Sequence, residues 1–162
     1  MTGKKKSKNK IEQLFKFKQR RIAIVDHDRK WRELVRVALT QKGALVTVGG
    51  YRTYQIERHI RPELVILGCI AFEADEIRVV IQLLRCGIEV VVMPAEPLSQ
   101  KMRELVEFGI CDVVKKTNDM TEIFKLAGRK LREIDRQPPR PPNSGLRQVV
   151  IAQKKLKKVR YA

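Results

Sequence analysis

Four short groups of residues have chemistry to offer, and each follows an apolar run. They are Asp26-His27-Asp28, Gly68-Cys69, Pro94-Ala95-Glu96 and Lys115-Lys116-Thr117. The carboxylates of Asp26 and Asp28 are oxygen ligands of the kind that Mg²⁺ takes, but two alone make a poor site. His27 lies between them and has a side chain whose charge changes near neutral pH. An ordinary surface histidine is the interpretation that we favour.

No catalytic or cofactor motif accompanies these groups. The sequence contains no P-loop, GxGxxG, HExxH or GxSxG pattern, and neither His27 nor His59 has a partner at catalytic spacing. Cys69, Cys86 and Cys111 are widely spaced and form no CxxC or Cys/His cluster. We therefore expect no metal, no cofactor and no enzymatic activity. The cysteines are expected to be small buried residues in a reducing cytoplasm.

The segments that carry these groups alternate between strand-like and helix-like patterns. Apolar runs of strand length lie at residues 21–25, 45–48, 64–67, 89–93 and 112–115. Apolar residues at helical spacing predict helices near 31–39, 53–60, 75–85, 99–106 and 119–134, with Asp28, Ser99 and Asp119 among the caps. Five strands alternating with five helices imply parallel pairing and right-handed crossovers. We predict an α/β fold with a doubly wound, five-stranded parallel sheet.

The net charge of +17 is concentrated at the two ends of the chain. Residues 1–21 hold nine Lys or Arg and one acid, and residues 136–162 hold eight Lys or Arg and no acid. Such clusters favour polyanions such as RNA, DNA or acidic lipid surfaces; plain solubility tails are the alternative. The proline-rich stretch 136–145 is typical of an extended linker. We therefore expect a basic arm (1–19), a domain (20–135), this linker and a basic tail (146–162).

The end of the arm leaves two interpretations open. Ile11, Leu14, Phe15 and Phe17 are interspersed with cations. The segment is either a short amphipathic helix that docks on the domain or an arm whose aromatic rings stack on bases.

Four different motifs contain the strand ends of the predicted domain: RIAIVDHD, RPELVILGC, EVVVMPAE and FGICDVVKKT. In this order and spacing they resemble the receiver domain of bacterial response regulators, over roughly residues 20–134. In that family, acidic residues after the first strand bind Mg²⁺, and an Asp ending the third strand accepts phosphate. A Thr or Ser ending the fourth strand contacts the phosphoryl group, and a Lys ending the fifth pairs with it. The resemblance implies a receiver-like, flavodoxin-like fold.

This sequence departs from the family at most of those positions. Asp26 matches the first acidic residue and Lys116 matches the Lys. His27 stands where a second Asp is usual, Gly68 where the phosphoacceptor is expected, and Pro94 in place of the Thr or Ser. A glycine has no side chain to phosphorylate, and a proline has neither a hydroxyl nor an amide hydrogen. Aspartyl phosphate is therefore not expected to form at residue 68.

We interpret these positions as a vestigial pocket, formed by Asp26, His27, Asp28, Gly68, Pro94 and Lys116. Within it Lys116 is expected to pair with Asp26. This pair either fixes the switch in one state or is merely structural, and we favour the second. Cys69 adjoins the lost acceptor, but strand alternation is expected to point it to the other face of the sheet.

The resemblance implies a phosphorylation-independent adaptor that acts in signalling and docks a protein through its fourth and fifth helices. The candidates on that face are Lys101, Arg103, Glu104, Glu122 and Lys125. A second hypothesis, compatible with the first, makes the fold a scaffold in a nucleic-acid or ribonucleoprotein complex. Phosphate contacts would then come from the arms, at Lys4, Lys5, Lys6, Lys8, Lys10, Lys154, Lys155, Lys157, Lys158 and Arg160. Without a helix-turn-helix or RNA-recognition signature, such binding is expected to be independent of sequence.

A membrane role is a weaker hypothesis. No stretch of the sequence is long and apolar enough for a membrane span, and no lipidation motif is present. The oligomeric state is left open by the sequence.

Overall fold

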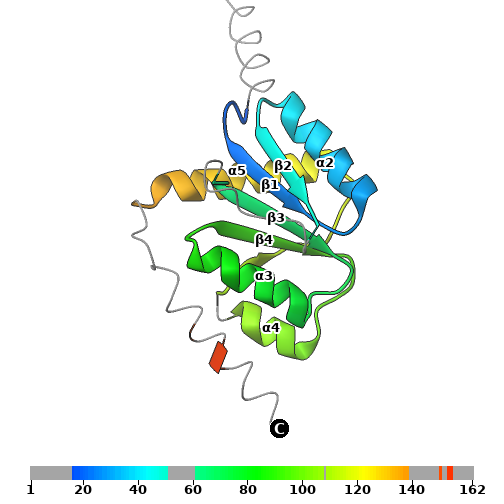
Figure 1. Ribbon diagram of the computed structural model, residues 1–162, viewed down its shortest axis with the longest axis vertical. Coiled ribbons are helices and arrows are strands. Elements are labelled where there is room, and N and C mark those ends of the chain that lie inside the picture. The colour runs from blue at the N-terminus through cyan, green and yellow to red at the C-terminus, as the bar shows by residue number, and fades with distance from the viewer. Residues whose placement is uncertain (1–15, 51–60, 108, 139–149, 151–152, 155–162) are drawn as a thin grey trace, which may run out of the picture.

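One parallel sheet forms the centre of the molecule in the computed structural model (Figure 1). The structure describes residues 16–50, 61–107, 109–138, 150, 153 and 154. The strands are β1 (Arg21–Val25), β2 (Leu45–Gly49), β3 (Leu64–Cys69), β4 (Glu89–Pro94) and β5 (Asp112–Val113). All pair in parallel, in the order β2-β1-β3-β4-β5, which is the order of flavodoxin-like sheets. The predicted α/β fold with a five-stranded parallel sheet is confirmed.

The described part of the chain contains four helices of the domain. They are α2 (Arg29–Gln41), α3 (Ala74–Arg85), α4 (Gln100–Glu107) and α5 (Met120–Arg136). The helix predicted over 53–60 lies outside the described residues. Capping at Asp28, Ser99 and Asp119 is confirmed, since each side chain accepts a hydrogen bond from a backbone N–H in the first turn. None of the described helices has the length and hydropathy of a membrane span.

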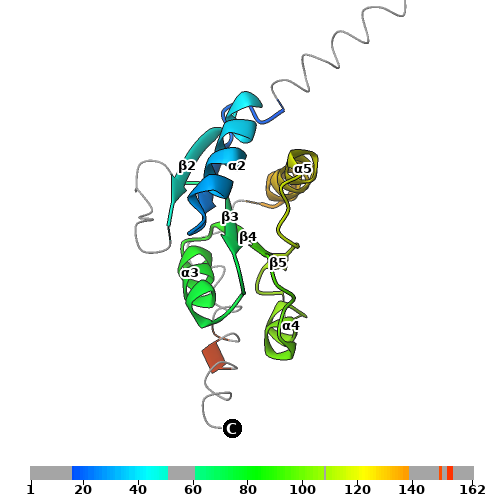
Figure 2. The ribbon, with the colours of Figure 1, turned by 90° about the vertical axis from the view of Figure 1, so that its right-hand side faces the viewer.

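Strand alternation divides the core into two hydrophobic clusters, one on each face of the sheet. Ile22 and Ile24 of β1 pack with residues of α2 and α5, whereas Ala23 and Val25 pack with residues of α3 and α4. Figure 2 shows α3 and α5 on opposite sides of the sheet. Helices therefore cover both faces of the sheet, as the predicted doubly wound arrangement requires.

The segment before β1 belongs to the folded body. Phe17 is only 1% exposed, and its ring centroid lies 6.3 Å from that of Phe124 in α5. Its backbone N–H donates to the carbonyl of Lys42, 2.9 Å away, and Gln19 N–H donates to the carbonyl of Gly43. Phe17 is thus a core residue rather than a ring free to stack on bases. Residues 1–15 lie outside the described part of the chain.

Arg20 ties together the end of the sheet opposite the predicted pocket. Its guanidinium donates two hydrogen bonds to Asp135 at the end of α5, at 2.9 and 3.0 Å, and lies 3.1 Å from Glu63 Oε1. Glu63 also accepts from the Arg21 backbone N–H at 2.9 Å. The hydrogen bonds between Arg20 and Asp135 raise the pKa of the arginine and lower the pKa of the carboxyl.

Lys130 is a buried cation on the inner side of α5. Its Nζ lies 2.5 Å from Asp112, 2.7 Å from Glu133 and 3.3 Å from Glu89. Burial by itself would lower the pKa of Lys130, but the hydrogen bonds to Asp112 and Glu133 outweigh it, so the pKa is raised. The contacts with Glu89 of β4 and Asp112 of β5 thus hold the helix against this edge of the sheet, whereas Glu133 is a partner within α5 itself.

Candidate functional site

The strand order brings the predicted pocket together at the carboxyl ends of the strands. Asp26 directly follows β1, Gly68 lies near the end of β3, and Pro94 ends β4. Lys116, three residues beyond β5, donates its backbone N–H to the carbonyl of Pro94 at 2.9 Å. Residues that are far apart in the sequence therefore meet at one edge of the sheet, where sites of such folds lie.

Asp26 and Lys116 form the ion pair that the resemblance implied. Lys116 Nζ donates to Asp26 Oδ2 at 2.6 Å, and the side chains are 13% and 4% exposed, respectively. The other carboxylate oxygen, Oδ1, accepts the backbone N–H of Asp28 at 2.8 Å. Both oxygens of the buried carboxylate therefore have partners, as the low polarity of the site demands.

Trp31 closes the pocket from α2. Its ring centroid lies 4.6 Å from Lys116 Nζ, a cation–π contact. Its Nε1 donates to the backbone carbonyl of Thr117 at 2.9 Å, and the residue is 3% exposed. The indole thus joins the first turn of α2 to the loop after β5, and it shields the Lys116–Asp26 pair from water.

Gly68 is the residue that makes this arrangement possible. A β-carbon on Gly68 would overlap Asp26 Oδ2, and it would lie 2.8 Å from Trp31 Cζ3 and 3.0 Å from Asp26 Cγ. Both of the latter distances are shorter than van der Waals contact between carbon atoms. The Asp26 carboxylate and the Trp31 ring therefore occupy the space that a side chain at position 68 would need.

The remaining pocket residues are either engaged elsewhere or exposed. The carboxylate of Asp28 caps α2, accepting from Lys30 N–H at 3.0 Å and from Trp31 N–H at 3.1 Å. His27 is exposed. Within the described part of the chain, no three His, Cys, Asp or Glu side chains gather in a way that could hold a metal ion. The two aspartates thus have their hydrogen-bonding capacity used by the protein itself.

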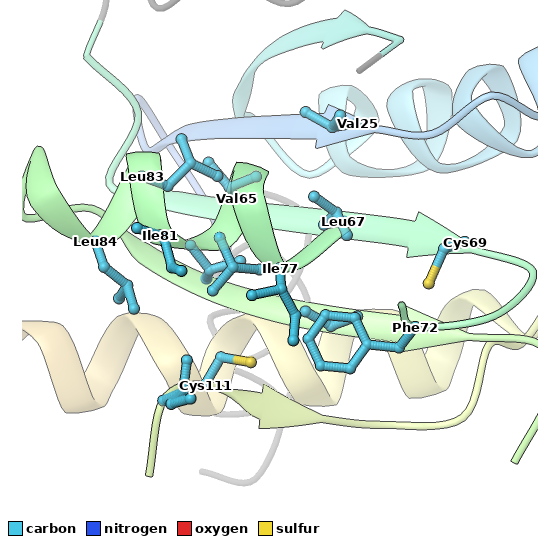
Figure 3. Close-up of a cluster of buried hydrophobic side chains, with 14 of the residues drawn as sticks. Val25, Val65, Leu67, Cys69, Phe72, Ile77, Ile81, Leu83, Leu84 and Cys111 are labelled. Carbon is cyan, nitrogen blue, oxygen red and sulfur yellow. The ribbon is translucent and has the colours of Figure 1, made fainter. Parts of the chain in front are cut away.

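Two of the cysteines are buried and one is not. Cys69 faces the α3 side of the sheet, as strand alternation predicted, and Figure 3 shows it among the apolar side chains there. Burial raises the pKa of the Cys111 thiol to about 12. The expectation of burial is wrong for Cys86, which is exposed. It is the residue at the C-terminal cap of α3, just beyond the apolar face of the helix.

The predicted docking residues lie on two helices separated by β5 (Figure 2). On α4, Arg103 and Glu104 are exposed, whereas Lys101 is half-buried. On α5, Lys125 and Glu122 are exposed and form an ion pair at 3.4 Å. The face therefore presents charges of both signs.

The predicted nucleic-acid contacts fall mostly outside the described residues. Lys154 is described and is exposed. The others lie beyond the described ranges, at Lys4, Lys5, Lys6, Lys8, Lys10, Lys155, Lys157, Lys158 and Arg160.

Sequence reasoning missed Trp31 as a pocket residue, because its place on the apolar stripe of α2 already explains it. The available signal was Gly68 itself. A glycine inside an apolar strand often marks a close approach by another group. That signal says that something fills the space, but it does not say what.

Comparison with known proteins identifies no family for this chain. No family model matches it, and no curated protein matches its sequence. The pocket geometry and the distribution of charge are therefore the features from which we infer a function.

Proposed function

We propose that this protein is a degenerate receiver domain that cannot be phosphorylated and acts as a protein-interaction adaptor. Its basic arms bind nucleic acid without sequence specificity. The observation that carries the first part is the overlap between the Asp26 carboxylate and any side chain at Gly68. Position 68 has no nucleophilic side chain, and the space for one is filled.

The electrostatics of the pocket support the same proposal. A phosphoryl group needs a cation to neutralise it, and Lys116 already pairs with Asp26 at 2.6 Å beneath the Trp31 ring. Binding a phosphoryl group would require breaking a buried ion pair, which costs about 3–5 kcal/mol when one partner is removed outright. The pocket is thus stable without a ligand, and the fold serves as a fixed shape for a partner.

The docking face of the adaptor lies on α4 and α5. Arg103, Glu104, Glu122 and Lys125 are exposed there, and charges of both signs favour a partner with a complementary pattern. The arms carry the second part of the proposal, since each end of the sequence has an excess of eight positive charges. Contacts of this kind go to phosphates and weaken steeply with salt.

A second candidate function is that of a nucleic-acid or ribonucleoprotein component whose fold is only a scaffold. The observation that favours it is the segregation of charge, because 22–135 has a balance of only +1. The two candidates differ in whether the α4–α5 face has a protein partner.

Phosphorylation is tested by incubating the full chain with acetyl phosphate and Mg²⁺ and measuring its intact mass. We expect no phosphorylated species, with a known receiver domain as the positive control. A phosphoadduct that disappears in Asp28→Asn would show that another carboxylate has taken the acceptor role, and the proposal would fail.

The docking face is tested by crosslinking in cells, with Arg103→Ala/Glu104→Ala compared against Arg78→Ala/Gln82→Ala on α3. All four residues are exposed on their helices. The adaptor proposal predicts one protein crosslink that only the α4 variant loses. Crosslinks to nucleic acid, with no protein crosslink that the α4 variant loses, would favour the scaffold function.

A further inference from the structure

Three arginines on the outer face of α5 have no carboxylate partner within the described structure. Arg129, Arg132 and Arg136 are all exposed and follow one another at i, i+3 and i+7, so they share one side of the helix. We call these three residues, together with Lys16, the α5 ridge. Successive cations along such a stripe are roughly one helical turn, about 5 Å, apart.

The acidic residues of α5 are all committed to other cations. Glu122 pairs with Lys125, Glu133 with Lys130, and Asp135 with Arg20. The helix therefore neutralises its lysines while leaving its arginines unpaired among the described residues. Three unpaired like charges along one face repel each other, and an anionic ligand would remove that repulsion.

Lys16 adds a fourth cation from outside the helix. Its Nζ lies 3.1 Å, and Arg132 Nη1 lies 3.4 Å, from the point that a β-carbon on Gly128 would occupy. Two cations thus converge above a helical residue that has no side chain to separate them. Gly128 lets Lys16 lie against α5, although glycine is less favourable than alanine in a helix interior.

A hollow of about 380 Å³ adjoins the ridge on the β5 side. Its polar lining comes from Arg129, Arg132, Thr117 and the ion pair of Glu122 and Lys125, and its apolar lining from Met93, Val114 and Leu126. Among the described residues no aromatic ring lines it, so a base would gain no ring stacking from them. The arrangement fits a ligand that offers regularly spaced anions with aliphatic groups between them.

We propose that the α5 ridge binds the phosphodiester backbone of a nucleic-acid strand. A strand presents one negative charge per nucleotide, which suits cations that repeat along a helix face. Five other lysines of the N-terminal arm precede Lys16 in the sequence, at Lys4, Lys5, Lys6, Lys8 and Lys10. The ridge therefore extends the footprint of that arm onto the folded domain. This inference rests on the nucleic-acid part of the proposed function.

The test compares two full-length triple variants that each remove three positive charges. The ridge variant is Arg129→Gln/Arg132→Gln/Arg136→Gln, and the control is Arg29→Gln/Lys30→Gln/Arg85→Gln, all at exposed positions. Affinity for labelled oligouridine and oligothymidine of equal length is measured across a salt series. Circular dichroism checks that both variants are folded.

The slope of log K against log salt is negative, and we expect the ridge variant to reduce its magnitude by about 2, because each lost phosphate contact contributes about 0.7 on a single strand. The control is expected to keep the wild-type slope, and the two oligonucleotides to bind alike. An equal reduction of the salt slope in both variants would overturn the proposal that the α5 ridge binds the strand, and it would leave the proposal for the arm intact. No binding by the wild-type chain would overturn both.

Poly-glutamate of similar charge serves as the competing polyanion. Displacement of the oligonucleotide by poly-glutamate at equal charge concentration, with the same dependence on the ridge arginines, would show a general polyanion surface and overturn the assignment to nucleic acid. Retention of the oligonucleotide supports it. The charge-neutral variant Gly128→Ala, which displaces the end of Lys16, is expected to weaken binding less than the triple variant does.

Discussion

The pocket and the α5 ridge both contain cations, but those cations differ in burial and in whether a carboxylate pairs with them. Lys116 is buried against Asp26 and Trp31, and no buried side-chain nitrogen or oxygen of the described residues lacks a hydrogen-bond partner. Arg129 and Arg132 are exposed beside a hollow, with no carboxylate partner among the described residues. A satisfied cation has little to gain from a ligand, whereas unpaired cations gain from any anion that reaches them. On our proposal, ligand binding therefore takes place at the helix surface rather than at the carboxyl ends of the strands.

The largest effect is expected from breaking the pocket pair. Asp26→Ala leaves Lys116 in a site where its side chain is only 13% exposed. We expect a loss of about 3 kcal/mol in the free energy of unfolding, measured with urea, because a buried charge loses its partner. Adding Lys116→Met in the same chain should recover most of the loss. A loss below about 1 kcal/mol would mean that the pocket is not the closed unit described here.

Gly68→Ala tests the packing of the pocket without changing any charge. The added methyl overlaps Asp26 Oδ2 and crowds Trp31, so we expect destabilisation of about 2 kcal/mol from overpacking. Gly128→Ala is the matched control on the ridge. Its methyl meets chiefly the flexible end of Lys16, and it should leave stability unchanged or raise it by up to about 1 kcal/mol. Equal destabilisation by both would contradict the account.

Lys130 is a second satisfied cation, and its pKa is raised in the folded protein. Its contribution to stability is therefore full below the unfolded pKa of about 10.5 and is lost as the pH rises through the higher folded value. We expect Lys130→Met to cost about 2 kcal/mol at neutral pH, since its carboxylate partners are partly exposed. In urea titrations, the difference in the free energy of unfolding between Lys130→Met and the wild type should shrink as the pH rises above about 10.5. A constant difference would contradict the role of its charge.

The smallest effect concerns Asp135, which keeps Arg20 beside the last turn of α5. The pKa of this carboxyl is lowered by its hydrogen bonds to Arg20. Its contribution is therefore present above the unfolded pKa of about 3.8 and disappears as the pH falls through the lower folded value. Because the side chain is 56% exposed, Asp135→Asn should cost less than about 1 kcal/mol at neutral pH. The two proteins should become equally stable in acid.

Much of the sheet was predictable because its strands are short apolar runs between turn residues. The bounds differ where pairing decides them. β3 extends to Cys69 since Gly68 pairs with Met93 and Cys69 with Pro94, whereas the edge strand β5 stops at Val113. The Asp26–Lys116 pair followed from the resemblance to receiver domains, and the structure contains it.

The contacts that fill space were not predictable from the sequence. Trp31 fits an ordinary helical stripe, so nothing in its spacing reveals its contact with Lys116. The position of Lys130 on the inner face of α5 indicates that its charge needs a buried partner. The sequence does not identify that partner, because Asp112 is 18 residues away. The convergence of Lys16 and Arg132 over Gly128 likewise depends on how the chain enters the fold.

Trp31 allows the most direct test of the closed pocket, because it is the only tryptophan in the chain. Its indole N–H resonance is measured by ¹⁵N NMR while the full chain is titrated with Mg²⁺ and beryllofluoride, an analogue of the phosphoryl group. We predict that the resonance stays in place, because the indole, Lys116 and Asp26 already satisfy one another. A saturable shift of that resonance would show that the pocket still binds a phosphoryl group, and it would contradict the account.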